Sequence, residues 1–241
     1  MLLQLDNVSK SFKGLMAINF VSIDVNEGEI LGLIGPNGAG KTTLFNLITG
    51  FHLPTKGKIL FEGNDITTTA THKRSWMGIA RTFQLVRIFP ELTILENVTI
   101  GRVYGSESVK NRARAEKEAD GFLETVGLAS RRAEKASRLT LVNRKRLELA
   151  RALATKPKLL LLDELLAGLN PSEILTSMDL IKSIRDTGIS IIMVEHLVKA
   201  VFGIADRIAV LNAGDLIAND SPKKVAHDQK VIDAYLGKAH E

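Results

Sequence analysis

Apolar and polar residues alternate in short runs along the first thirty positions of the chain. The alternation at Leu3–Leu5 and at 20–25 is typical of β-strands, and the short connections favour antiparallel pairing. The continuous apolar run Ile30–Ile34 precedes a glycine-rich turn, which predicts a strand buried on both faces. Residues 42–49 then predict a helix, and residues 58–61 predict another strand.

Helical periodicity dominates from Glu91 to Ala154, and strand patterns return after it. The later segments are strands expected at 159–162, 190–194 and 207–211 and helices expected at 172–186 and 197–204. Alternating strands and helices indicate an α/β fold with a mainly parallel sheet. We therefore predict one domain over residues 1–241, with a core and an antiparallel β part from 1–90 and 155–241 and an inserted helical part at about 91–154.

Composition and charge narrow the class of protein. The chain has no cysteine, which excludes a disulfide framework and cysteine-ligated zinc and fits a reducing compartment. The formal net charge of +5 would suit nucleic acid or anionic lipid, but the positive residues are dispersed, which favours a mildly basic protein without such a partner. No apolar run approaches the ~20 residues of a membrane span, and the N-terminus lacks a signal-peptide pattern, so we expect any membrane part on another chain.

A phosphate-binding motif follows the strand predicted at 30–34. The motif G-x-x-x-x-G-K-[ST] is matched in full by Gly35, Pro36, Asn37, Gly38, Ala39, Gly40, Lys41 and Thr42. Small residues let backbone N–H groups surround phosphates, and the next helix points its positive end at them. Lys41 is expected to reach the β- and γ-phosphates, Thr42 to ligate Mg²⁺, and Thr43 to line the same helix start. A chance glycine-rich turn is the alternative, but the flanking strand and helix favour a site for ATP with Mg²⁺.

A pair of carboxylates ends the apolar strand Leu159–Leu162. Nucleotide sites of α/β folds lie at the carboxyl edge of the sheet, where Asp163 and Glu164 are expected. Asp163 would hold Mg²⁺, directly or through water, and Glu164 would orient or deprotonate the attacking water. A pair of acidic residues at a strand end is weak evidence for a nucleotide site by itself, but together with the upstream loop it predicts ATP hydrolysis.

The order of the motifs resembles that of the ATP-binding subunits of ABC transporters, over essentially the whole chain. The ordered set is the glycine-rich loop, Gln84, Asp163-Glu164, Ala167-Gly168-Leu169-Asn170 and His196. The resemblance implies a P-loop NTPase core with a mainly parallel sheet, an N-terminal antiparallel β subdomain and an inserted α-helical subdomain. It also implies catalytic roles for Lys41 and Glu164, contact of Gln84 with Mg²⁺ or the water, and contact of His196 with the γ-phosphate.

The same resemblance implies roles for residues outside the loop. Phe12 would stack on adenine, although a buried phenylalanine in a β segment is the alternative. Residues 86–89 would line a groove that receives a helix of the membrane subunit. Asn170 stands where the family often has aspartate, at the seam between two ATP-binding subunits.

Within the family, the chain is similar to the branched-chain amino acid importer type. The stretches that carry this similarity are 78–84, 88–98, 146–154, 167–171 and 231–237. The resemblance implies transmembrane permease subunits, a second ATP-binding subunit in a homo- or heterodimer, and indirectly a solute-binding protein, with this chain on the cytoplasmic face of the membrane. Alternatives are lipid or lipopolysaccharide export, urea or amide uptake, a non-catalytic regulatory subunit, or a soluble ATPase acting on nucleic acid. The single loop and short helical insertion disfavour nucleic acid as a partner.

One segment departs from the family pattern. The family signature Leu-Ser-Gly-Gly-Gln, which grips ATP bound to the opposite subunit, is replaced by Leu139-Thr140-Leu141-Val142-Asn143. Thr140 could replace the serine hydroxyl, and Asn143 is expected to cap a helix beginning near Arg144. The two larger side chains that replace glycine would impede close backbone approach. The segment is therefore either a tolerated variant or one half of an asymmetric motor, in which the site closed by 139–143 hydrolyses slowly or not at all.

Overall fold

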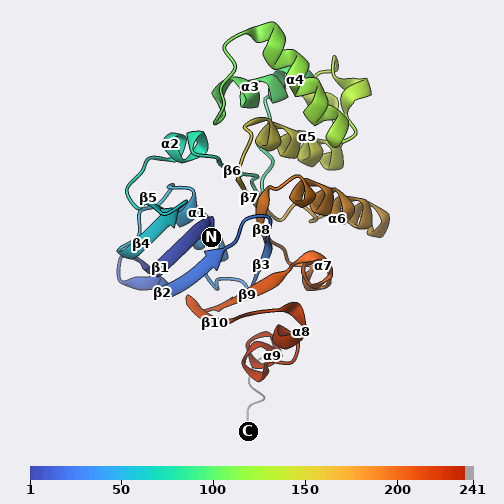
Figure 1. Ribbon diagram of the computed structural model, residues 1–241. Helices are drawn as coiled ribbons and strands as arrows, with labels where there is room; N and C mark the ends of the chain where they lie inside the picture. The colour runs from blue at the N-terminus through green and yellow to red at the C-terminus, as the bar shows by residue number, and fades with distance from the viewer. Residues whose placement is uncertain (237–241) are drawn as a thin grey trace.

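The computed structural model describes residues 1–236 and contains two β-sheets and a set of helices (Figure 1). The smaller sheet is antiparallel, with the strand order β2-β1-β4-β5. Its strands are β1 (Leu3–Phe12), β2 (Leu15–Val25), β4 (Lys56–Phe61) and β5 (Asn64–Asp65). The antiparallel pairing expected near the N-terminus is therefore confirmed.

The larger sheet is mainly parallel, with the order β10-β9-β3-β8-β7-β6. Its strands are β3 (Ile30–Ile34), β6 (Ile79–Arg81), β7 (Leu159–Asp163), β8 (Ser190–Val194), β9 (Arg207–Asn212) and β10 (Asp215–Asp220). Only β10, at one edge, runs antiparallel to its neighbour. All five residues of β3 are buried, as its apolar run predicts.

Helices lie beside the larger sheet and at both ends of the molecule. Those that follow strands of the core are α1 (Lys41–Ile48), α2 (Thr71–Trp76), α6 (Pro171–Asp186) and α7 (Val198–Ile204). At one end lie α3 (Ile94–Tyr104), α4 (Arg112–Thr125) and α5 (Leu141–Ala154), with short 3-10 turns at Ala129–Arg131 and Ala136–Arg138. At the other end lie α8 (Pro222–Val225) and α9 (Gln229–Leu236). The division into a core and an insertion at about 91–154 stays our interpretation of this arrangement.

Two separate apolar clusters lie on opposite faces of the larger sheet. Because successive side chains of a strand point to opposite faces, Leu160 and Leu162 enter one cluster while Leu159 and Leu161 enter the other. The first cluster joins the sheet to α3–α7, and the second joins it to α1 and the smaller sheet. The larger sheet is thus the middle layer, and its carboxyl edge is held from both faces.

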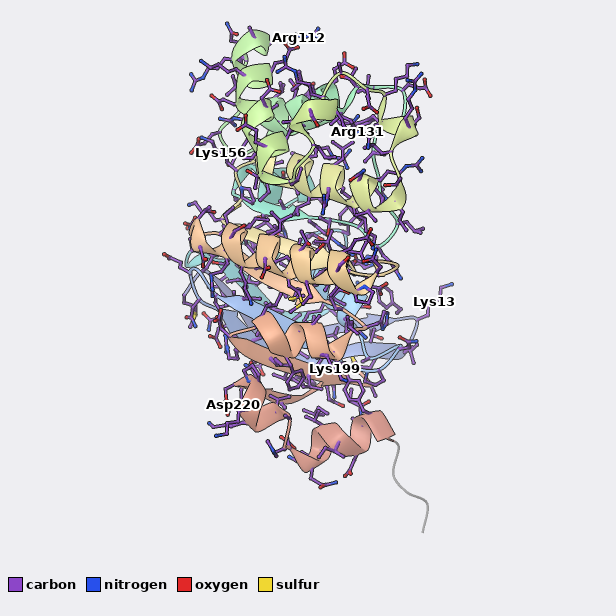
Figure 2. The ribbon with its side chains drawn as sticks, turned by 90° about the vertical axis from the view of Figure 1, so that its right-hand side faces the viewer. Lys13, Arg112, Arg131, Lys156, Lys199 and Asp220 are labelled. Atoms are coloured by element: carbon purple, nitrogen blue, oxygen red, sulfur yellow. The ribbon has the colours of Figure 1, made fainter. Side chains whose placement is uncertain are left out.

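Charged side chains are spread over the surface. Figure 2 shows Arg112, Arg131 and Lys156 in the part formed by α3–α5, Lys199 on α7, and Lys13 in the turn between β1 and β2. Within residues 1–236, no helix has the length and apolar character required to cross a bilayer. The similarity noted at 231–237 falls on α9 and on Gly237, which lies outside the described residues.

Candidate functional site

The glycine-rich loop joins β3 to α1 and has a conformation that only glycine suits at two positions. Gly35 has a φ of 151°, and a Cβ there would lie 2.1 Å from the carbonyl oxygen of Leu211. Gly40 has a φ of 105°, and a Cβ there would lie 2.6 Å from the carbonyl oxygen of Ala17. The loop therefore packs against β9 and β2 with its backbone, which leaves its opposite side for a ligand.

Lys41 begins α1, and its side chain turns back over the loop. Its Nζ donates hydrogen bonds to the carbonyl oxygens of Gly35, at 2.6 Å, and Pro36, at 3.0 Å. The residue is 8% exposed, and burial lowers the pKa of its ammonium group, while Glu164 and Asp163 oppose this effect. A largely desolvated ammonium at the loop interacts more strongly with a polyphosphate than it would in bulk water.

Glu164 follows β7 and is held by two side chains from other elements. Its Oε2 accepts a hydrogen bond from Gln84 Nε2 at 2.9 Å, and its Oε1 lies 2.8 Å from His196 Nε2. Its backbone has a φ of 52°, which a non-glycine residue rarely adopts, and its N–H donates to the carbonyl oxygen of Val194 at 2.9 Å. The turn thus directs the carboxylate away from the end of β7 and toward the glycine-rich loop.

One cavity of about 450 Å³ brings the two motifs together. The sequence-predicted residues that line it are Asn37, Gly38, Ala39, Gly40, Lys41, Thr42, Thr43, Gln84, Glu164 and His196. Ala17 and Val194, which the motifs do not indicate, complete the wall. Residues separated by more than a hundred positions in the sequence therefore meet at the carboxyl edge of the larger sheet.

Asp163 lies beside this cavity but does not line it. Its Oδ2 accepts a hydrogen bond of 2.5 Å from Arg81 Nη2, and both side chains are almost fully buried. Arg81 also donates to Asn46 Oδ1 at 2.6 Å, so the guanidinium group connects β7 to α1. Arg81 is a residue of this site that the motifs alone did not indicate.

Six other candidate residues do not line the cavity. Two of them, Gly35 and Pro36, belong to the loop and accept hydrogen bonds from Lys41, and the other four lie on other elements. Phe12, at the end of β1, is 39% exposed and packs edge to face against His52, so it is not a core residue. Asn170 is the N-cap of α6 and forms a capping box with Glu173. Thr140 and Asn143, the two candidate residues of the altered signature, lie at the start of α5.

The expected helix cap at Asn143 is wrong. α5 begins at Leu141, and Thr140 is its N-cap, with extended backbone angles and no side-chain cap hydrogen bond. Asn143 already lies within the first helical turn, so its side chain cannot occupy the capping position. The helix begins earlier because the carbonyl oxygen of Thr140 accepts the hydrogen bond from the Arg144 N–H, at 2.9 Å.

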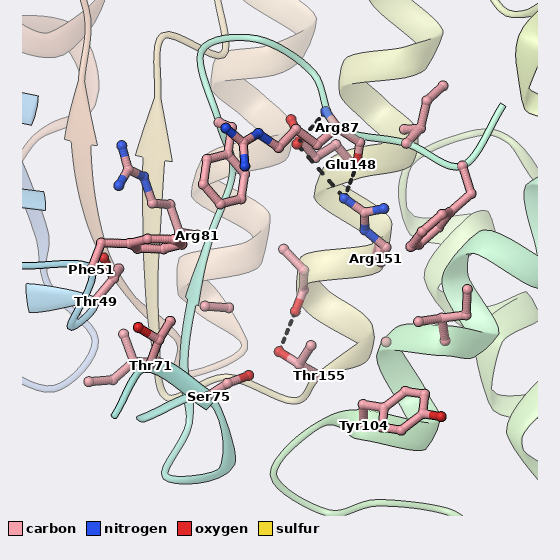
Figure 3. Close-up of a pocket in the computed structure, with 18 residues that line it drawn as sticks. Thr49, Phe51, Thr71, Ser75, Arg81, Arg87, Tyr104, Glu148, Arg151 and Thr155 are labelled. Atoms are coloured by element: carbon pink, nitrogen blue, oxygen red, sulfur yellow. Dashed lines mark hydrogen bonds and ion pairs between the residues drawn. The ribbon is translucent and has the colours of Figure 1, made fainter. Parts of the chain in front are cut away.

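A groove of about 550 Å³ lies between the core and α3–α5 (Figure 3). Aromatic residues that line it include Phe51, Phe83, Phe89 and Tyr104, and Arg87, Ile88, Glu148 and Arg151 also contribute. Of the expected segment 86–89, residues 87–89 line this groove, and Val86 does not. Glu148 Oε1 accepts a hydrogen bond from the Arg87 N–H at 3.0 Å, and burial raises the pKa of the Glu148 carboxyl group.

The chemistry of the first cavity fits a nucleoside triphosphate with a magnesium ion. One wall offers the Lys41 ammonium, two threonine hydroxyls and the N-terminus of the eight-residue helix α1. The other wall offers the Glu164 carboxylate, the Gln84 amide and the His196 imidazole. Cationic and N–H groups suit phosphate, whereas hydroxyl, amide and carboxylate oxygens suit Mg²⁺.

Comparison with known proteins identifies the family. A family model described as ABC transporter matches residues 18–167, more than half of the chain. The chain belongs to the ABC transporter family. It is an ATP-binding cassette, so it binds nucleotide, and its activity is ATP hydrolysis coupled to transport.

Similar proteins cover this cassette almost end to end. The chain is 40% identical over 251 aligned positions to the high-affinity branched-chain amino acid transport ATP-binding protein LivG of Salmonella typhimurium, covering 99% of this chain and 98% of LivG. It is 38% identical to BraF of Pseudomonas aeruginosa, with the same coverage, and 35% identical to the lipopolysaccharide export protein LptB of Haemophilus influenzae, covering 98% of this chain and 97% of LptB.

Solved structures agree with the fold of the cassette. The ADP conformation of MJ1267, an ATP-binding cassette of an ABC transporter, superimposes with a TM-score of 0.88 at 33% identity, covering 98% of this chain and 99% of that one. A dimeric post-hydrolysis state of the cassette MJ0796, bound to ADP and phosphate, has a TM-score of 0.82 at 25% identity, covering 91% and 98%. The predicted fold class is confirmed, and the family implies dimerisation and permease partners for this cassette.

Proposed function

We propose that this chain hydrolyses ATP to drive the import of branched-chain amino acids through a membrane transporter. The observation that carries the proposal is the placement of Glu164 between Gln84 and His196, facing Lys41 and Thr42 across one cavity. The cargo class rests on LivG and BraF, which are more similar to this chain than LptB is. The cassette would act at the cytoplasmic face of the membrane, bound to permease subunits.

The chemical step requires a water molecule held in line with the γ-phosphorus. In the proposed site, Glu164 accepts a proton from that water or orients it, and the hydrogen bonds from Gln84 and His196 fix the carboxylate. Lys41 and the N-terminus of α1 stabilise negative charge that develops on the phosphate. Thr42 and Gln84 would hold Mg²⁺, which neutralises charge on the phosphate oxygens when it is bound. Asp163, which is paired with Arg81 beside the cavity, would contact the ion through water.

A second ATP-binding subunit would complete the site. Thr140 and Asn143 lie outside the cavity, so any contact they make with nucleotide would be with one bound to the partner. Leu141, in the same turn, is 52% exposed, and its side chain would lie where the family signature has glycine. This exposed leucine supports the asymmetric arrangement, in which the site closed by α5 turns over more slowly than the site that contains Glu164.

The groove between the core and α3–α5 would receive a helix of a permease subunit. Its exposed aromatic residues, Phe51 at 50% and Tyr104 at 69%, offer an apolar surface, and Arg87 and Arg151 offer positive charge beside it. Asn97 is fully buried and fixes this wall, because it accepts a hydrogen bond from the Phe89 N–H at 2.8 Å and donates to the Phe89 carbonyl at 3.0 Å. A partner helix with apolar and acidic residues would suit this lining.

Leucine uptake by the assembled transporter in proteoliposomes tests this function. Lys41→Ala removes the ammonium that would bind the phosphates, so we expect ATP-driven uptake to fall by at least about a hundredfold while the cassette stays folded. Lys117→Ala, at an exposed position on α4, is the matched control and should keep wild-type uptake. Substantial uptake with Lys41→Ala would contradict the site, and ATP turnover without leucine uptake by the wild type would contradict the cargo.

A further inference from the structure

Lys145 lies on α5 and binds three backbone carbonyls of another segment. The residue is 7% exposed, and its Nζ donates hydrogen bonds to the carbonyl oxygens of Glu164 at 2.8 Å, Leu165 at 3.0 Å and Ala167 at 2.6 Å. An ammonium group has three donors, so all of them are used on the turn that follows β7. No motif or proposed role accounts for this side chain.

The turn held by Lys145 is the one that presents Glu164. Glu164 has a φ of 52°, and a backbone of this kind persists only where its surroundings fix it. Within the same turn, Glu195 Oε1 accepts a hydrogen bond from the Leu166 N–H at 2.8 Å. Two buried side chains, Lys145 and Glu195, therefore fix the turn at four consecutive residues, 164–167.

The same helix carries the altered signature at its N-terminus. Lys145 is four residues after Leu141, so both side chains lie on one face of α5. Leu141 lies near Gly168 of the same turn, because a Cβ added to Gly168 would lie 3.4 Å from Leu141 Cδ2. The hydrogen bonds of Lys145 thus join α5 to the backbone of Glu164, one helical turn after Leu141.

We propose that Lys145 is a positioning residue that couples the signature end of α5 to Glu164. When the N-terminus of α5 engages nucleotide on a partner subunit, any displacement of the helix passes through Lys145 to the carbonyls at 164–167 and so to the Glu164 carboxylate. Lys145 touches neither nucleotide nor water in this account. The inference rests on the proposed function, because it requires a second subunit whose nucleotide meets α5.

Substitution of Lys145 in the assembled transporter tests this coupling. Lys145→Met keeps the length of the side chain but removes all three donors, and Lys145→Gln keeps two donors without the charge. We expect kcat for ATP to fall at least about tenfold in Lys145→Met and about threefold in Lys145→Gln, since each lost hydrogen bond loosens Glu164. The KM for ATP should stay within about twofold, because the glycine-rich loop is unchanged. The dependence of the rate on ATP concentration should also lose cooperativity.

The matched control is Lys117→Met, which removes an exposed ammonium on α4 and should keep wild-type kinetics. A cooperative thermal unfolding transition shows which variants are folded. If Lys145→Met does not fold, the kinetics of Lys145→Gln are compared with wild type instead. A folded variant with wild-type kcat and cooperativity would overturn the inference, as would a loss confined to thermal stability. If the wild type itself hydrolyses no ATP, the proposed function fails instead, so the two failures are distinguishable.

Discussion

Glu195 is a buried carboxyl group directly before His196. It is 4% exposed, and burial raises its pKa to about 7. The Leu166 N–H and the Lys145 ammonium oppose this rise in pKa, whereas the negative charges of Glu164 and Asp163 add to it. The protonated carboxyl group still accepts the hydrogen bond from Leu166, so the folded state can hold the proton without losing this contact. Glu195 therefore links the stability of the turn at 164–167 to pH.

The sign of this dependence follows from the raised pKa. Between the ordinary pKa of 4.5 and about 7, the folded state binds a proton that the unfolded state has lost, so stability falls as pH rises through this range. Between pH 5 and pH 8, we expect the unfolding free energy of the wild type to fall by up to about 3 kcal/mol relative to that of Glu195→Gln, since each unit of pKa shift is worth about 1.4 kcal/mol.

Urea unfolding of both proteins across this pH range gives the measurement. Glu124→Gln, at an exposed position on α4, is the control and should follow the wild-type curve. A difference in unfolding free energy between wild type and Glu195→Gln that stays constant from pH 5 to pH 8 would contradict the raised pKa.

At the scale of elements, α1 depends on a cap that comes from a different helix. Arg74 of α2 is fully buried, and its Nη1 donates to the carbonyl oxygens of Leu47 at 2.7 Å and Ile48 at 2.8 Å. Its Nη2 and Nε donate to the carbonyls of Thr67 and Thr69. α1 has no basic residue in its own last turn, so the Arg74 guanidinium supplies the positive charge at the negative end of this helix.

Arg74→Met should destabilise the cassette by at least about 3 kcal/mol, because four carbonyl groups, two of them in buried hydrogen bonds, lose their donor while the apolar volume is largely kept. Burial lowers the pKa of the guanidinium group to about 10, so it stays charged at neutral pH. The free energy of unfolding in urea is the measurement, with Lys73→Met on exposed α2 surface as the control. Equal stability of Arg74→Met and wild type would show that the cap contributes nothing.

The elements that the sequence predicts well are those with buried, unbroken patterns. β3, β7 and β8 consist wholly of buried residues, so their apolar runs are unambiguous. The edge strand β10 and the short helices α2 and α8 were not predicted, because they are partly exposed and stabilised by neighbours rather than by a periodic pattern. The cap at Asn143 failed for a related reason, since the start of α5 depends on Thr140 backbone geometry that residue type does not fix.

At the scale of the whole molecule, the candidate site divides into two kinds of residue. The glycine-rich loop and the Asp163-Glu164 pair sit in local motifs that spacing along the chain predicts, whereas His196 was indicated only by the resemblance to the family. Arg81, Lys145 and Glu195 act through backbone or side-chain partners between 19 and 82 residues away, so only the folded chain shows them. The motifs identify the groups that would meet the nucleotide, and the fold identifies those that hold them.

The central claim is that the Glu164 carboxylate carries the hydrolysis step. Phosphate release from MgATP by the assembled transporter tests it most directly, with Glu164→Gln compared with wild type and with Glu124→Gln as an exposed control. We expect Glu164→Gln to bind ATP with wild-type affinity and to lose about a hundredfold or more in kcat, the usual contribution of a general base. Phosphate release at the wild-type rate by folded, ATP-binding Glu164→Gln would contradict the account.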